Sequence, residues 1–160
     1  MQFNISCLLF IRNHNNKILL LKRRKSPNKG KWSPPGGKLN MEDGESPVEC
    51  AIRETKEETG MVLEETDLHL FGYVSEKCYE NSGHWLMFLF DSKKNIEHLP
   101  KKFDEGYFEF FEENAIDELN IPDSDHKLVW PYYFKRNDNF WGLRAKWVNG
   151  DPKIKIEAKA

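Results

Sequence analysis

Three glutamates in one short segment, Glu54, Glu57 and Glu58, have the residue type and spacing to bind a divalent cation. In a helix, at about 100° per residue, they fall within about 100° of one another. Like charges three or four residues apart destabilise a helix by a few tenths of a kcal/mol per pair, unless a cation lies among them. Carboxylate oxygens suit Mg²⁺ or Mn²⁺, which share their remaining positions with water and substrate phosphates. The segment therefore predicts metal-dependent phosphate chemistry, and the alternative is a solvated helix face.

The residues before and after these glutamates predict the helix that carries them. Ser46 to Glu49 form a capping-box sequence with Pro at the first helical position, and Gly60 stands where a left-handed residue ends a helix. We therefore expect a helix over residues 47–59. The residues that share its packing face are Val48, Ala51, Ile52, Thr55 and Thr59. On that face, the Thr55 hydroxyl can donate to the carbonyl of the preceding turn.

A longer pattern surrounds the three glutamates. Its members are Gly37, Gly44, Glu45, Arg53, Glu54, Glu57, Glu58 and Gly60. The pattern resembles the Nudix box of the nucleoside-diphosphate-linked hydrolases, here over residues 37–61 of a single domain spanning 1–160. The resemblance implies that the three glutamates bind the metals, while Glu45 and Arg53 form a supporting pair.

The loop that opens this box departs from the family pattern. Gly37 and Glu45 enclose seven residues, whereas the family has five. The extra residues lie within 39–43, before the helix, so the register from Glu45 to Gly60 is intact. We expect a different loop conformation and an unchanged metal face.

A further carboxylate from outside the helix is implied by the same resemblance. Asp104 and Glu105 lie just before an aromatic segment, 107–111, that reads as a strand. We choose Glu105 as the added metal ligand and keep Asp104 as the alternative. Without the resemblance, Glu105 is equally well interpreted as a solvated loop residue. Glu57, Glu58 and Glu105 are each candidates for the general base. Together with Arg53, whose role is structural first, they form the predicted catalytic set.

Contacts with phosphate are predicted from glycines and basic residues near the box. Gly36 and Gly37 allow a close backbone approach to phosphate or metal. Lys38 follows them, and Arg23 and Arg24 end a predicted strand that leads towards the box. Arg can grip a phosphate with two donors, whereas Lys acts as a point charge. Because side chains alternate along a strand, the neighbouring basic residues cannot all face the site.

Recognition of a base is predicted from aromatic and acidic residues. Trp32 lies beside the box, and Asp123 and Asp125 precede an aromatic run that resembles the oxidised-purine-sanitising, MutT-like members of the family. Asp125 is the preferred base-reading residue. The alternative is that Asp123 or Ser124 caps a helix and that the tryptophans belong to the core.

Composition narrows the classes of function. A chain of 160 residues with 39% hydrophobic residues can bury one core. Twenty-four basic against 26 acidic residues give a net charge of -2, which disfavours binding to nucleic-acid polymers and fits a small polyanionic substrate. The three cysteines have no metal-ligand spacing, and Cys50 is expected to be a small buried residue. The apolar run 5–11 is too short for a signal peptide or a membrane span, so we expect a cytoplasmic protein. For the oligomeric state, we expect a monomer or a homodimer.

The wider pattern predicts an α/β fold. The expected strands are 3–12, 17–22, 68–74, 84–90, 107–111, 140–148 and 153–156, and the other expected helices are 112–119 and 123–134. These elements form a mixed sheet flanked by helices, and the resemblance specifies the Nudix α/β/α sandwich.

The first function that the sequence favours is Mg²⁺-dependent hydrolysis of a nucleoside triphosphate, such as 8-oxo-dGTP, to a monophosphate and pyrophosphate. A first strand starting near Phe3 favours it over ADP-ribose or nucleotide-sugar hydrolysis, where an N-terminal region is common. Tyr73 and Tyr79 keep a diadenosine polyphosphate open. A non-catalytic nucleotide-binding regulatory module is the third reading. It is disfavoured because the metal-face glutamates are all present.

Overall fold

The computed structural model describes residues 2–78 and 83–160, and its strands form two sheets. In spatial order the larger, mixed sheet contains β4 (Gly36–Lys38), β1 (Phe3–Phe10), β6 (His84–Ser92), β5 (Leu68–Lys77), β8 (Trp141–Val148) and β9 (Asp151–Lys159). Within it, β1 and β6 are parallel, as are β5 and β8. The smaller, antiparallel sheet contains β3 (Trp32–Ser33), β2 (Ile18–Arg23) and β7 (Gly106–Phe111). The mixed sheet predicted from the sequence is confirmed.

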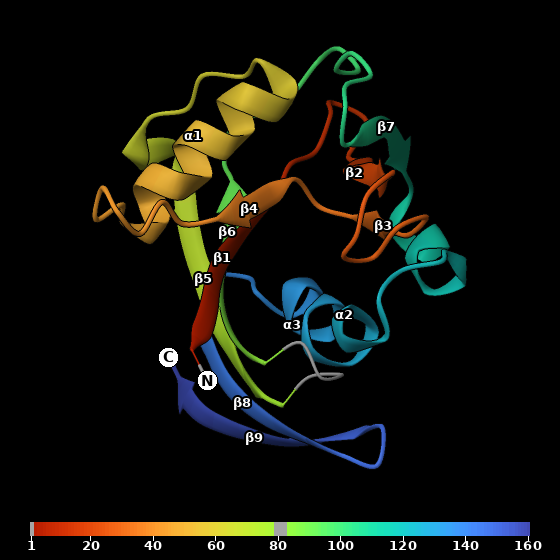
Figure 1. Cartoon of the computed structure of the whole chain (residues 1–160). Helices are drawn as coiled ribbons and strands as arrows, with labels where there is room; N and C mark the ends of the chain where they lie inside the picture. The colour runs from red at the N-terminus through yellow and green to blue at the C-terminus, as the bar shows by residue number, and fades with distance from the viewer. Residues whose placement is uncertain (1, 79–82) are drawn as a thin grey trace.

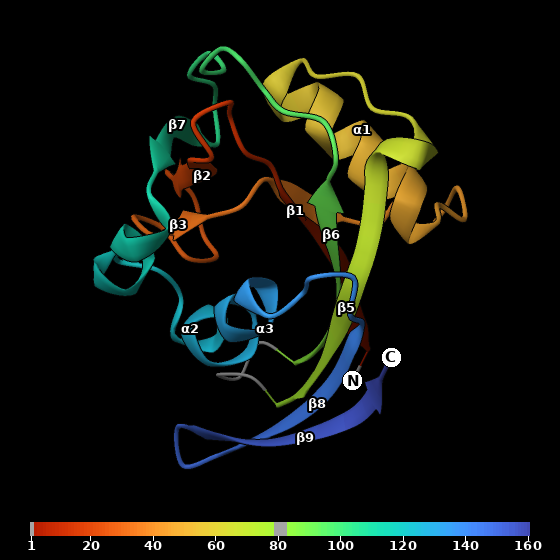
Figure 2. The ribbon, with the colours of Figure 1, turned by 180° about the vertical axis from the view of Figure 1, so that it is seen from behind.

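Strand β1 contributes to two hydrophobic cores, because successive side chains of a strand point to opposite faces. Cys7 and Leu9 lie in the core beneath α1 (Pro47–Thr59). Leu8 and Phe10 face the other core, which contains residues of α2 (Asp123–Leu128) and α3 (Trp130–Phe134). Helix α1 therefore covers one face of the large sheet, while α2 and α3 cover the other face (Figures 1 and 2). This layering is the predicted α/β/α sandwich.

Helix α1 has the predicted boundaries and caps. The Ser46 hydroxyl accepts from the Glu49 amide, the Glu49 carboxylate accepts from the Ser46 amide, and Gly60 is left-handed at φ 78°. Thr55 is buried and its hydroxyl donates to the Ala51 carbonyl at 2.7 Å, as predicted. Cys50 is also buried, as expected. A strongly specified helix therefore holds the glutamate segment.

The structure corrects several expected elements. The helix expected over 112–119 is a 3₁₀ helix, Glu113–Glu118. The helix expected over 123–134 is broken at Val129 into α2 and α3, because Pro131 lacks the amide that would donate to the preceding turn. The short strands β3 and β4 and the 3₁₀ turn Glu65–Asp67 were not predicted. Across the described residues, no helix is long and apolar enough to cross a membrane.

Candidate active site between helix α1 and helix α2

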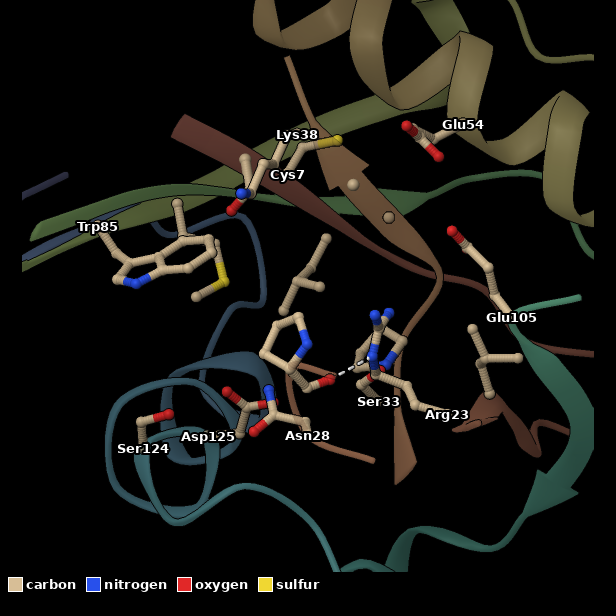
Figure 3. Close-up of a pocket in the computed structure, with 18 of the residues that line it drawn as sticks. Cys7, Arg23, Asn28, Ser33, Lys38, Glu54, Trp85, Glu105, Ser124 and Asp125 are labelled. Atoms are coloured by element: carbon tan, nitrogen blue, oxygen red, sulfur yellow. Dashed lines mark hydrogen bonds between the residues drawn. The ribbon is translucent and has the colours of Figure 1, made fainter. Parts of the chain in front are cut away.

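A cavity of about 460 Å³ lies between helix α1, which carries the glutamates, and helix α2. Its residues come from strands β1 to β6, from helices α1 and α2, and from the loops around them. They are Ser6, Cys7, Leu8, Leu21, Arg23, Pro27, Asn28, Ser33, Pro34, Gly36, Gly37, Lys38, Glu54, Glu76, Trp85, Met87, Glu105, Ser124 and Asp125. Figure 3 shows Glu54 and Glu105 on one side of this cavity, with Ser124 and Asp125 on the opposite side. The site therefore has two chemically different ends.

Arg53 organises the loop and the helix at the first end. Its guanidinium donates to both oxygens of Glu45, from Nε at 2.6 Å and from Nη2 at 2.8 Å. The same group donates to Glu54 at 2.9 Å, to Glu57 at 3.2 Å and to the Lys38 carbonyl at 3.1 Å. Hydrogen bonding from Arg53 lowers the pKa of Glu45 to about 2. Arg53 and Glu45 thus support the site, as the sequence suggested, and neither lines the cavity.

Glu54 and Glu58 are held close to the glycine turn. The amide of Gly36 donates to Glu58 Oε2 at 3.3 Å, and a Cβ placed on Gly37 would overlap the Glu54 carboxylate. Gly37 is therefore required for close packing of the Glu54 carboxylate, since any side chain would displace it. Burial, reinforced by the charges of Glu54 and Glu105, raises the pKa of Glu58 to about 9. Glu58 Oε1 is buried without a hydrogen-bond partner among the described residues.

Glu105 joins this acidic cluster from the other sheet. It immediately precedes β7, and its backbone carbonyl accepts from the Arg24 amide at 2.8 Å. Its charge contributes to the raised pKa of both Glu54 and Glu58. Glu105 also lines the cavity beside Glu54, whereas Asp104 does not. The carboxylate chosen from the sequence therefore lies next to the glutamate helix.

The donor chemistry of this end fits a hard divalent cation. The mutual repulsion of these carboxylates contributes to the raised pKa of Glu58, and one Glu58 oxygen is buried without a hydrogen-bond partner among the described residues. A divalent cation would stabilise such a cluster. Glu57 differs from the others, because its side chain is 59% exposed and contacts Arg53. Within 2–78 and 83–160, no three acidic, histidine or cysteine side chains already converge on one point. The case for a divalent cation therefore rests on the carboxylate chemistry of Glu54, Glu58 and Glu105, and not on a preformed set of converging ligands.

Two basic side chains reach the cavity. Arg23 lines it, with its Nε donating to the Pro27 carbonyl at 2.7 Å, and Lys38 extends over the Trp85 ring with Nζ 5.4 Å from the ring centroid. Arg24 is exposed and does not line the cavity, so its role as a phosphate contact stays a prediction. Strand β2 ends at Arg23, and Arg24 is the first residue after it.

The opposite end of the cavity contains Asp125, the base-reading residue preferred from the sequence. Asp125 is 6% exposed on α2, and burial together with the charge of Glu76 raises its pKa to about 7. Trp32, by contrast, is a core residue that packs edge-on against Tyr107 and Phe111, so its predicted stacking role is wrong.

Asp123 also lies outside the cavity. Its side chain is 55% exposed and pairs with Lys127 at 3.1 Å. The base-reading role of Asp123 therefore stays a prediction, and the structure places this side chain away from Asp125 and the cavity. The cap position is Pro122 and carries no side-chain capping bond, so Asp123 and Ser124 do not cap the helix. Tyr73 donates to Glu157 at 2.8 Å, away from the cavity, and Tyr79 falls outside the described residues.

Sequence reasoning missed Glu76 and Trp85, which face each other across β5 and β6 and both line the cavity. Glu76 is only 3% exposed. The available signal was its position two residues after Val74, because residues i and i+2 of a strand share a face and Val74 is apolar. That signal shows a charged side chain on an inward face, but it does not identify what the face lines.

Comparison with known proteins supports a family assignment. The model of the NUDIX domain matches residues 2–133. The chain belongs to the Nudix family. It is 31% identical over 116 residues to an uncharacterized Nudix hydrolase, YvcI, of Bacillus subtilis, covering 72% of this chain and 70% of that one. It is 33% identical over 121 residues to the ADP-ribose pyrophosphatase of Methanocaldococcus jannaschii, covering 76% and 68%.

A solved structure shows the same fold. The MutT protein of Bacillus halodurans superposes with a TM-score of 0.75 at 22% identity, over 96% of this chain and 97% of that one. This likeness shows a MutT-like fold. With the family match, the protein is a Nudix hydrolase, a class that acts on nucleotide-linked substrates. Nudix hydrolases generally use divalent cations, which agrees with the ligand chemistry of the acidic end.

The longer loop of this Nudix box is closed on itself. The Asn40 amide donates to Glu45 Oε1 at 2.9 Å, and the Glu45 amide donates to the Asn40 carbonyl at 3.1 Å. Residues 41–44 between these anchors are exposed. The additional length therefore projects into solvent, and Glu45 still reaches Arg53.

Proposed function

We propose that this Nudix hydrolase is a Mg²⁺-dependent pyrophosphohydrolase of purine nucleoside triphosphates, such as 8-oxo-dGTP, which releases a nucleoside monophosphate and pyrophosphate. The observation that supports this proposal is the pairing of two unlike ends in one cavity. Glu54 and Glu105 lie at one end with Arg23 and Lys38 within the same lining, and buried Asp125 lies at the other. A triphosphate fits the first end and a hydrogen-bonding base fits the second.

The chain's own residues supply three functions at the phosphate end. Arg23 and Lys38 offer positive charge to phosphate oxygens. Gly36 and Gly37 allow the backbone to pass close to the carboxylates of helix α1, and Arg53 holds this helix against the loop. Glu54, Glu58 and Glu105 would hold the cations, with Glu57 as a further predicted ligand. Bound Mg²⁺ would neutralise phosphate charge and lower the pKa of a water. Glu57, Glu58 and Glu105 remain the candidate bases.

A second candidate is hydrolysis of ADP-ribose. It is favoured by the 33% identity to an ADP-ribose pyrophosphatase. The two candidates differ at the base, because an adenine edge offers one donor and one acceptor to Asp125 and Glu76, whereas a guanine-type edge offers two donors. Two buried acidic residues, Asp125 and Glu76, therefore support a guanine-type triphosphate over an adenosine diphosphate sugar.

The test is turnover of a substrate panel with and without Mg²⁺. The panel contains 8-oxo-dGTP, dGTP, dATP, CTP, ADP-ribose, a nucleotide sugar and diadenosine tetraphosphate, with monophosphate and pyrophosphate measured separately. We expect 8-oxo-dGTP to be preferred and pyrophosphate to be released only with a divalent cation. Preferred cleavage of ADP-ribose to AMP and ribose phosphate would establish the second candidate and refute the first.

The metal assignment has its own control. Glu54→Gln and Glu105→Gln remove cavity carboxylates, whereas Glu109→Gln makes the same change at an exposed position of β7. We expect the first two to lower kcat by at least about 100-fold, as loss of a metal ligand does, while Glu109→Gln retains wild-type turnover. Full Mg²⁺-dependent turnover in both cavity variants would refute the assignment.

A further inference from the structure

A second buried carboxylate, Glu76, faces the cavity close to Asp125. Glu76 belongs to β5, where it is 3% exposed and pairs in register with Trp85 of β6 and Ala145 of β8. Burying a carboxylate costs several kcal/mol unless hydrogen bonds compensate. Glu76 therefore places a hydrogen-bonded carboxylate on an inward face of β5, where it lines the cavity.

One oxygen of Glu76 is held by a neighbouring indole. Trp147 Nε1 donates to Glu76 Oε2 at 2.9 Å from the adjacent strand β8. The hydrogen bond fixes the carboxylate on the face of the sheet that lines the cavity. Trp85 and Met87 of β6 line the same cavity, so apolar side chains flank the carboxylate. The arrangement is a directed acceptor beside an apolar surface that suits a planar ring.

Asp125 supplies the second acceptor from the opposite element. It lies on α2, lines the same cavity and is close enough to Glu76 for the two charges to interact, with Lys31 partly offsetting them. Two neighbouring carboxylates repel acceptor atoms and bind donors. A guanine-type base presents two donors on one edge, N1–H and the 2-amino group. Adenine and cytosine present one amino donor beside a ring-nitrogen acceptor.

We propose that Glu76 is a specificity-determining residue which, together with Asp125, accepts hydrogen bonds from the N1–H and 2-amino group of a guanine-type base, with Trp147 as its positioning residue. The inference rests on the proposed function, because it places the phosphates at the Glu54 end. It does not depend on oxidation of the base, since guanine and 8-oxoguanine share this edge.

The experiment compares dGTP, dITP and dATP, because dITP differs from dGTP only by the missing 2-amino group. Assays at pH 8.5, above the pKa of about 7 of Asp125, keep that side chain ionised. A hydrogen bond to a charged group contributes more binding free energy than one between neutral groups. We therefore expect wild type to prefer dGTP over dITP and dATP by about 10- to 100-fold in kcat/KM. Glu76→Gln should reduce this preference at least about tenfold, through KM and not kcat. Glu109→Gln, the matched exposed change, should leave the preference unaltered.

Equilibrium binding of dGMP, dIMP and dAMP separates this inference from the proposed function, because it requires no turnover. If triphosphates are not hydrolysed, the proposed function fails, yet a dGMP preference that Glu76→Gln abolishes still supports the inference. Equal affinities in wild type, or a preference unchanged in Glu76→Gln, overturn it. Thermal melting confirms that each variant folds. Should Glu76→Gln not fold, Trp147→Phe removes the indole hydrogen bond to the carboxylate without removing the carboxylate. A folded Trp147→Phe protein with the full preference would also overturn the inference.

Discussion

Replacing Glu45 by Gln tests whether the Glu45–Arg53 pair holds the loop to helix α1. The substitution keeps the shape of the side chain and removes its charge. Arg53 donates to both Glu45 oxygens, and the Glu45 side chain is 10% exposed while that of Arg53 is 32% exposed. We expect the variant to fold with a lower free energy of unfolding.

The size of the loss follows from the pKa of Glu45, which falls from an ordinary 4.5 to about 2. At about 1.4 kcal/mol per tenfold change, the upper bound at neutral pH is about 3 kcal/mol. Solvent screening at the partly exposed Arg53 reduces this to about 1.5–2 kcal/mol. Because the folded-state pKa is depressed, this stability is complete above the unfolded pKa and is lost as pH falls towards 2. About three fifths should remain at pH 3.5.

The assay is urea unfolding of wild type and Glu45→Gln at pH 7 and pH 3.5. The difference in free energy of unfolding should shrink from about 1.5–2 to about 1 kcal/mol. Glu42→Gln, in the same loop and exposed, is the matched control and should change stability by less than about 0.5 kcal/mol at either pH. A Glu45→Gln loss that equals the control, or that does not depend on pH, would refute the reasoning.

Three further predictions concern the acidic end and its neighbours. Glu58→Gln should raise the metal-free melting temperature, because the glutamate is buried with a pKa near 9, while it abolishes Mg²⁺-dependent turnover; a lower melting temperature in calorimetry would contradict this. Gly37→Ala should reduce turnover at least about tenfold with the fold retained in circular dichroism, since the new methyl group would displace Glu54, and unaltered kinetics would contradict the close contact. Arg23→Ala should raise KM for a triphosphate about tenfold and weaken its dependence on salt, and an unchanged KM would exclude the phosphate contact.

Local signals explain why helix α1 could be predicted so fully. The capping residues Ser46 and Glu49, the terminal Gly60 and the packing of Thr55 all act within one or two turns, so their neighbours in sequence are their neighbours in space. The break at Val129 was missed although Pro131 signals it, because the apolar run 128–134 continues across the break.

The composition of the cavity could be predicted only in part, because it depends on sheet register and on which face each helix presents. Asp125 faces the cavity and Asp123 faces solvent, although both lie in the first turn of α2. Trp32 packs against β7, a contact that no local pattern encodes. Glu76 reaches the cavity because β5 lies between β6 and β8, which is decided by tertiary topology.

Because the loop of residues 40–45 is closed on itself, its length can change without changing the geometry of the helix that follows it. Its anchors are the paired hydrogen bonds between Asn40 and Glu45, and the residues between them make a single exposed turn. Doubling the length of a flexible loop costs only about 0.6 kcal/mol in closure entropy. The turn is thus a natural insertion point, where a peptide epitope or a fluorophore-bearing residue can be added next to the catalytic helix without altering its register.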